Sequence, residues 1–368
     1  MSEKRIVNEV DAICRRRFLA SLTRTVGLSA ALTAGLSACA VRPSGADPAG
    51  NAGLSRAAAL AAAVPMPDDA AVQTHYLDWH DSTRDRPVAA KLYLPADAPR
   101  DQAVPRKLPL LVVSHGLGGS REGYSYLGKF LATQGYACLH LQHVGSDRSL
   151  WSGNVLSLVS RLQAAAHESE AIHRVDDKRF ALDQLLSSRW GESIDPLHIM
   201  AAGHSYGANT CLLACGATVQ RVGPSGQQTL NYRDARIRAA VVISAPPFYG
   251  MGDMRSILAS VQVPTLHITS TSDEIIVPGY HSAPADRISV FDAIGGPRKT
   301  LAVFQGGSHS MFTDRLNTGG AELNPKVKVA TRQLALAFLN HIRGASAQPM
   351  SAWAKDNQAL LDRFELNS

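Results

Sequence analysis

The sequence is poor in aromatic residues, poor in charge and without an internal repeat. Aromatic residues make up 6% and charged residues 18% of the chain, while hydrophobic residues make up 45%. This is the composition of an ordinary soluble protein with a core. The 368 residues are enough for one large domain with additional segments.

Cysteine is also scarce, with five residues in the chain. Cys14 and Cys39 lie near the start, whereas Cys138, Cys211 and Cys215 lie in apolar strand-like or helix-like runs. We interpret the last three as small buried residues. They therefore predict neither a disulfide framework nor a metal site.

Half of the net positive charge comes from the first 38 residues. The formal net charge is +6, but the first 38 residues hold six basic and only three acidic residues. The rest of the chain is weakly basic and lacks a run of Lys and Arg. The sequence therefore offers no argument for a nucleic-acid partner.

No apolar run near the start is long enough to anchor the chain as a membrane helix. The run from Thr25 to Ala38 is uncharged, weakly apolar and short. It follows Arg15-Arg16-Arg17-Phe18-Leu19, and together they fit the charged and apolar regions of a signal peptide. The arginine pair resembles the twin-arginine export signal.

A cysteine directly follows this leader. Leu36-Ser37-Ala38-Cys39 resembles the bacterial lipobox, in which the cysteine is lipidated and becomes the mature N-terminus. We expect a signal peptide over residues 1–38 and a flexible Ala/Gly/Pro tether over 39–70. The protein would then be exported to the periplasm or cell envelope, with a lipid anchor on Cys39. The alternative is an ordinary signal peptide cleaved near Ala40.

From residue 71 to residue 368, short apolar runs alternate with amphipathic helical patterns. Val72 to Trp79 and Val88 to Leu94 predict an antiparallel hairpin at a sheet edge. Further strands are predicted over residues 108–114, 136–141, 196–203, 239–245, 263–269 and, as the last strand, 300–304. One more helix is expected over residues 350–363. The alternation predicts an α/β domain, with a mostly parallel central sheet and helices on both faces.

A serine sits where one of these strands turns into a helix. Gly203-His204-Ser205-Tyr206-Gly207 has the G-x-S-x-G pattern of a nucleophile elbow. The flanking glycines let strand and helix approach closely. A strained turn projects the serine hydroxyl from the sheet. We therefore predict that Ser205 is a nucleophile.

Two further polar residues follow later strands. Asp273 comes after the strand at 263–269, and His309 comes after the strand at 300–304. The carboxyl ends of parallel strands gather at one edge, where ligands bind. His309 is the predicted base for Ser205, and Asp273 the predicted acid that orients the imidazole. Other carboxylates that follow the elbow are alternatives for the acid: Asp253, Glu274, Asp286 and Asp292.

The order serine, acid, histidine is the α/β-hydrolase order. Four motifs carry a closer resemblance: Ser114 to Tyr124, His143 to Asp147, Arg174-Val175-Asp176-Asp177 and the elbow. Over about residues 71 to 345 the chain resembles bacterial hydrolases described as predicted dienelactone hydrolases. It also resembles the platelet-activating-factor acetylhydrolase group.

This resemblance implies an oxyanion hole made by the backbone N–H groups of Leu117 and Tyr206. The chain departs from both groups. True dienelactone hydrolases use a cysteine where this chain has Ser205. In the plasma acetylhydrolases the acid follows the strand directly after the elbow, but here that strand ends Ser244-Ala245-Pro246-Pro247 without a carboxylate.

A segment over residues 143–170 is a candidate lid, because Gly153 to His167 predicts an inserted helix beside the site. Four large apolar residues follow strand ends or lie in this segment. We predict that they line an acyl pocket: Trp151, Phe248, Tyr249 and Met251.

These observations predict a serine esterase that cleaves small or short-acyl carboxylic esters. The chemistry needs no metal or organic cofactor. His140 and His143 have an H-x-x-H spacing but no third ligand, so no metal site is predicted. Two alternatives stay open: a lipase or acyltransferase with the same three residues, and a non-catalytic binding lipoprotein of the cell envelope.

Overall fold

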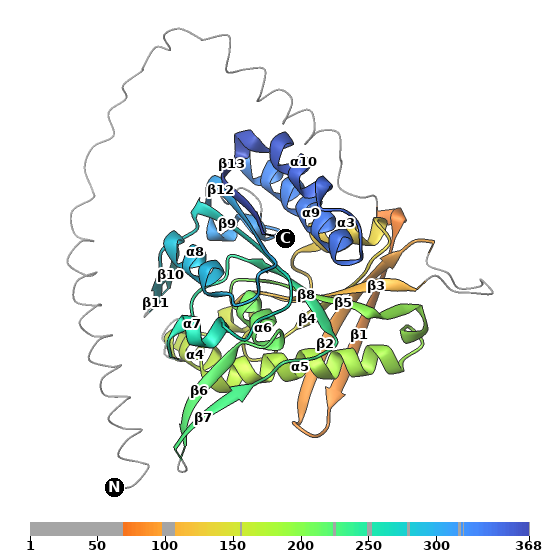
Figure 1. Ribbon diagram of the computed structural model, residues 1–368. Coiled ribbons are helices and arrows are strands. Elements are labelled where there is room, and N and C mark those ends of the chain that lie inside the picture. Colours follow the sequence, from red (N-terminus) through yellow and green to blue (C-terminus); the bar gives the residue numbers. More distant parts are fainter. Residues whose placement is uncertain are drawn as a thin grey trace, which may run out of the picture. The chain divides into compact units, whose positions relative to one another are not determined.

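The computed structural model describes residues 69–97, 107–154, 157–223, 226–248, 252–277, 280–315, 318 and 320–367 (Figure 1). The leader, Cys39 and most of the expected tether lie outside these residues. Within the described part of the chain, no helix combines the length and apolar character needed to cross a bilayer.

A nine-stranded sheet organises the domain, in the order β1-β2-β4-β3-β5-β8-β9-β12-β13. Its strands are β1 (Val72–Asp81), β2 (Arg86–Pro95), β3 (Leu108–Ser114), β4 (Ala137–Gln142), β5 (Ile194–His204), β8 (Ile237–Ile243), β9 (Thr265–Ser272), β12 (Lys299–Ser308) and β13 (Leu361–Asn367). The six strands from β4 to β12 in this order pair in parallel. The predicted mostly parallel sheet with an antiparallel β1–β2 edge hairpin is confirmed.

Helices cover both faces of this sheet (Figure 1). They are α3 (Ser125–Thr133), α4 (Leu158–Ala165), α5 (Glu168–Ser187), α6 (Tyr206–Ala214), α7 (Met254–Leu258), α8 (Pro284–Ala293), α9 (Leu323–Ile342) and α10 (Gln348–Asp356). Successive strand residues alternate between the two faces. In β3, Leu111 packs in the cluster with α3 and α9, whereas Leu110 packs in the cluster with α5.

The sequence analysis was wrong at the C-terminal edge of the sheet. Residues 300–304 are not the last strand, because β13 follows and pairs antiparallel with β12. The helix expected over 350–363 ends at Asp356 in α10. Residues from Leu361 onward extend because the open edge of β12 offers unpaired backbone groups. This pairing joins segments far apart in the chain.

Two shorter hairpins accompany the main sheet. Strands β6 (Thr218–Gly223) and β7 (Gly226–Asn231) pair antiparallel, and the sequence analysis did not predict them. Strands β10 (Ile275–Val277) and β11 (Tyr280–Ser282) form a separate two-stranded sheet.

Candidate active site

Ser205 lies at the sharp turn between β5 and α6, with φ 55° and ψ −124°. This backbone conformation is strained for any residue except glycine. The turn is tight because the backbone of α6 closely approaches the backbones of β3 and β5. A Cβ at Gly207 would lie 2.0 Å from the Ser114 carbonyl oxygen, and one at Gly203 would lie 2.1 Å from the Gly207 oxygen. The predicted elbow geometry is confirmed at the level of the backbone.

Asp273 and His309 meet at the ends of β9 and β12. The His309 Nδ1 lies 2.7 Å from Asp273 Oδ1. Because a carboxylate only accepts, Nδ1 carries the proton and Nε2 is left to accept one. Asp273 is completely buried, and its second oxygen accepts a 2.7 Å bond from the Thr269 hydroxyl.

The charge state of Asp273 follows from its surroundings. Burial raises its pKa, but the hydrogen bond and charge of His309 and the nearby Arg287 guanidinium outweigh burial. The Arg287 Nε lies 3.6 Å from Asp273 Oδ1. The net effect holds the Asp273 pKa well below its usual range, so this carboxylate stays ionised at neutral pH.

The base loop, residues 306–310 at and after the end of β12, carries His309 and is attached to β9. Gly306 and Gly307 both have positive φ, and hydroxyls on β9 bind their backbone. The Gly306 N–H donates to Thr271 Oγ1 at 2.8 Å, and the Ser270 hydroxyl donates to the Gly307 carbonyl at 3.0 Å. The polar run that precedes Asp273 therefore fixes the base loop as well as the acid.

Ser205 and His309 are neighbours through the intervening His204. The His204 Nε2 lies 2.9 Å from the His309 carbonyl, and the two rings are 4.6 Å apart between centroids. Within the described residues, no hydrogen bond joins the Ser205 hydroxyl to His309. Catalytic hydrogen bonds are often long without substrate.

Sequence reasoning missed a partner of His204. The Tyr124 hydroxyl lies 2.9 Å from His204 Nδ1 and accepts a 3.3 Å bond from the Gly116 N–H. Burial lowers the pKa of His204 to about 3, so this ring is neutral. Tyr124 itself has φ 62° and directly precedes the first residue of α3.

The glycine loop that follows β3 lies against the elbow. A Cβ on Gly116 would lie 3.2 Å from the Ser205 Cβ. Gly118 has φ 71°, and its N–H donates to the Ser146 carbonyl at 2.8 Å. Among the described residues, the Leu117 and Tyr206 N–H groups have no acceptor. The Tyr206 N–H belongs to the first turn of α6, where helix donors lack intrahelical partners.

Trp151 lies against this glycine loop. Its indole N–H donates to the Gly118 carbonyl at 2.9 Å, yet 48% of the residue stays exposed. Phe248 is buried in the core cluster beneath α6. Tyr249 and Met251, the other predicted pocket residues, lie outside the described part of the chain.

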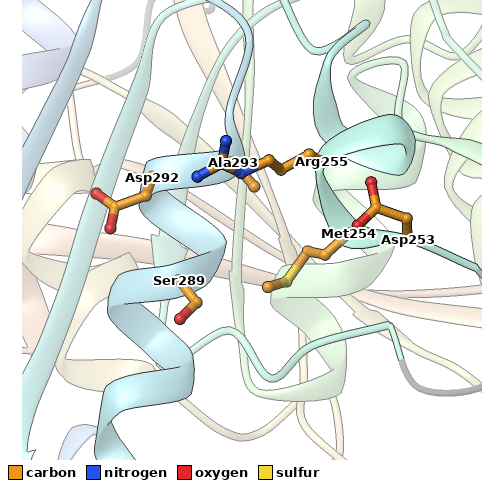
Figure 2. A pocket seen from close by; sticks show the side chains of 6 residues that line it. All are labelled: Asp253, Met254, Arg255, Ser289, Asp292 and Ala293. Atoms are coloured by element: carbon orange, nitrogen blue, oxygen red, sulfur yellow. The ribbon is translucent and has the colours of Figure 1, made fainter.

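The alternative acids lie elsewhere. Asp253 caps α7 by accepting from the Ser256 N–H at 2.9 Å. Asp253 and Asp292 line a surface cavity of about 240 Å³ between α7 and α8 (Figure 2), and none of Ser205, Asp273 or His309 lines it. Asp286 binds the Ser282 hydroxyl at 2.8 Å, and Glu274 is exposed. Of the five candidates, Asp273 alone is hydrogen-bonded to His309 among the described residues.

Comparisons with known proteins agree with this architecture. Residues 86–178 match the family model described as platelet-activating factor acetylhydrolase, isoform II. No curated protein matches the chain. A ferulic acid esterase from Streptomyces cinnamoneus is 19% identical with a TM-score of 0.54, over 78% of this chain and 97% of that chain. A cold-adapted esterase from an Arctic intertidal metagenomic library is 18% identical with a TM-score of 0.43, over 66% and 88%. The strand order, the elbow and the first of these structures together show that the chain has the α/β-hydrolase fold.

Proposed function

We propose that the protein hydrolyses carboxylic esters with Ser205 as nucleophile, His309 as base and Asp273 as the acid. The observation that carries this proposal is the 2.7 Å bond between Asp273 and His309 in a loop that also contacts His204, the neighbour of Ser205. The bond assigns the Nδ1 proton to Asp273, so in the neutral imidazole Nε2 is the nitrogen that can accept a proton, as a base requires. The family-model match and the esterase structure support the same chemistry.

The reaction proceeds in two halves. The Ser205 Oγ attacks the ester carbonyl carbon while its proton passes to His309 Nε2. The carbonyl oxygen becomes an oxyanion, which accepts from the Leu117 and Tyr206 N–H groups. When this intermediate collapses, the alcohol leaves with the proton from His309. Water then attacks the acyl-enzyme by the same route and releases the acid.

Substrate choice follows from the residues around the glycine loop. Leu117 packs with Leu150, Leu158 and Leu162 in a small apolar cluster, and the exposed Trp151 ring lies next to it. We propose a small or short-acyl ester as the substrate, and these apolar side chains are candidates to contact its acyl part. A lipase or an acyltransferase would use the same three residues, and a panel of p-nitrophenyl esters of rising chain length separates these alternatives.

A fluorophosphonate probe tests the proposal directly, because it labels an activated serine. Wild-type protein should be labelled and Ser205→Ala should not. Ester hydrolysis should fall by up to about a million-fold in Ser205→Ala. Ser289→Ala, on the exposed face of α8, is the matched control and should match the wild type. A wild type that resists the probe and cleaves no ester would instead favour a non-catalytic binding lipoprotein.

We also propose that the chain is exported and held at a membrane by a lipid on Cys39. The support is the arginine pair at Arg15-Arg16 and the lipobox-like Leu36 to Cys39. Cys39→Ser should move the protein from the detergent phase to the aqueous phase. Wild-type protein recovered wholly in the aqueous phase would contradict the anchor.

A further inference from the structure

A buried arginine lies beneath the glycine loop and the elbow. Arg174, on α5, has no exposed surface. Burying a guanidinium is unfavourable unless its N–H groups find acceptors. Arg174 finds three, in three separate segments. Nε donates to Thr210 Oγ1 at 2.8 Å, Nη1 donates to Ser146 Oγ at 2.8 Å, and Nη2 donates to the His115 carbonyl.

One of these hydrogen bonds and a separate ring contact lead to the elbow. The Thr210 hydroxyl accepts from Arg174 and donates to the Tyr206 carbonyl at 3.0 Å. The Arg174 guanidinium also lies 4.5 Å from the centre of the Tyr206 ring, within cation–π range. Arg174 therefore holds Tyr206 through its carbonyl and through its ring. The N–H of the same residue is one of the two candidate oxyanion donors.

The other contacts lead to the glycine loop. The His115 carbonyl belongs to the residue two positions before Leu117. Ser146 accepts from Arg174 with its side chain and from the Gly118 N–H with its carbonyl, directly after Leu117. Arg174 therefore fixes the backbone on both sides of Leu117, which carries the second candidate donor.

Among the described residues, no carboxylate forms an ion pair or hydrogen bond with Arg174, whose bonds go to hydroxyl and carbonyl oxygens. Its counter-charge comes through Ser146, whose hydroxyl donates to Glu170 Oε1 at 2.8 Å. Glu170 and Asp177 are in turn paired with Arg86. The Arg174 guanidinium is therefore held between the glycine loop and the elbow by several neutral acceptors, and not by one ion-pair partner.

We propose that Arg174 is a positioning residue that holds the Leu117 and Tyr206 N–H groups at the spacing an oxyanion needs. The inference rests on the proposed ester hydrolysis. Donors that are already aimed at the developing charge cost no reorganisation during the reaction. A misplacement of about 1 Å in such a site lowers the rate by about a hundredfold.

Arg174→Lys tests the proposal, because lysine keeps the charge but cannot reach three acceptors in fixed directions. We expect kcat for p-nitrophenyl acetate to fall about a hundredfold, with KM within about twofold. Affinity for an aryl trifluoromethyl ketone, which forms an oxyanion on Ser205, should fall by a similar factor. The acid limb of the kcat pH profile should not move, since His309 and Asp273 are untouched.

Arg332→Lys is the matched control. Arg332 is also a buried helical arginine, 1% exposed, but it lies on α9 with its guanidinium over the Phe130 ring. It should lower thermal stability and leave kcat and ketone affinity near wild type. Arg174→Lys would overturn the proposal if it lowered stability alone in the same way.

Thr210→Val is a second variant that removes only the bridge to the Tyr206 carbonyl, so it keeps the test informative if Arg174→Lys does not fold. We expect Thr210→Val to lower kcat about five- to twentyfold. In the double variant with Arg174→Lys, Thr210→Val should lower kcat by a smaller factor, because both substitutions break the same contact. Unchanged kcat in Thr210→Val would count against the proposal. If wild-type protein cleaves esters and Ser205→Ala does not, any failure belongs to the Arg174 inference alone.

Discussion

The two sides of the candidate site are held in place by different kinds of interaction. The acid–base side, made of Asp273, His309 and residues 269–271 of β9, is held by hydroxyl groups, one carboxylate and the nearby Arg287. The loop side, made of residues 115–119, residues 143–147 and their partners on α5, is held by buried ions. His309 changes its charge during the proposed reaction, whereas no group on the loop side does. The ion network of the loop side therefore keeps the same charges throughout the proposed reaction, so it can hold a constant geometry there.

Among the variants that compare the two sides, removing the carboxylate on the acid–base side should give the largest effect. We expect Asp273→Asn to lower kcat by up to about ten-thousand-fold, because an amide can stabilise the wrong tautomer of His309. Glu274→Gln, one residue along, should stay within about tenfold. Kinetics with p-nitrophenyl acetate measure both variants.

Asp253→Asn serves as the control, because Asp253 comes after β8, the strand that follows the elbow, but caps α7. It should behave like the wild type. If kcat fell strongly in Asp253→Asn and stayed near the wild-type value in Asp273→Asn, the catalytic acid would come after the earlier strand, β8.

The loop side should instead determine how the fold responds to acid. The His143 Nδ1 lies 3.1 Å from Asp177 Oδ2, and its Nε2 lies 3.1 Å from the Ser114 hydroxyl. Burial and the charges of Arg174, Lys178 and Arg86 hold the His143 pKa well below its ordinary value. Burial likewise lowers the pKa of His115 to about 3. Both rings are therefore neutral in the folded protein.

On unfolding, these histidines regain an ordinary pKa near 6.5 and take up protons. The stability that they contribute is therefore present above about pH 6.5 and is lost as the pH falls below it, by about 1.4 kcal/mol per pH unit for each proton. Asp273 differs: because its pKa is lowered, the stability that it contributes is present above about pH 4 and is lost only as the pH falls below that value.

Urea unfolding at pH 7, 5.5 and 4.5 separates the two sides. His143→Gln keeps a donor for Asp177 and an acceptor for Ser114, so it should flatten the dependence of stability on pH. Asp273→Asn should run parallel to the wild type over this range. The opposite result, a weaker dependence of stability on pH in Asp273→Asn and a wild-type dependence in His143→Gln, would assign the acid response to the acid–base side.

The same comparison explains what the sequence could predict. The elbow, Asp273 and His309 follow strand ends in a recognisable order, and short apolar strands with turn residues are local signals. The structure brings Asp273 and His309 together as their positions indicated. The residues of the loop side act through contacts between distant segments, which a single sequence does not reveal.

A signal for Arg174 was nevertheless present. The inward face of α5 carries Glu170, Arg174, Asp177 and Lys178 at helical spacing, mixed with buried apolar residues such as Leu182. Charges on the apolar stripe of a helix are unusual unless they pair inside the fold. The sequence of β13 carried no comparable signal, because these residues adopt the extended conformation by pairing with the edge of β12.

The smallest expected effect concerns the hydroxyls that hold the base loop. Ser270 is buried, and its hydroxyl donates to the Gly307 carbonyl at 3.0 Å. Ser270→Ala leaves that carbonyl without this donor, which lowers stability by about 1 kcal/mol. The Thr271 bond to the Gly306 N–H and the His204 bond to the His309 carbonyl stay intact. We therefore expect kcat to fall only three- to fivefold, with Ser289→Ala as the exposed control.

Thr210→Val removes one of the contacts through which Arg174 holds Tyr206, so it should lower kcat more than Ser270→Ala does. A Ser270→Ala variant with a lower kcat than Thr210→Val would mean that hydroxyls, and not the buried guanidinium, set the geometry of the site.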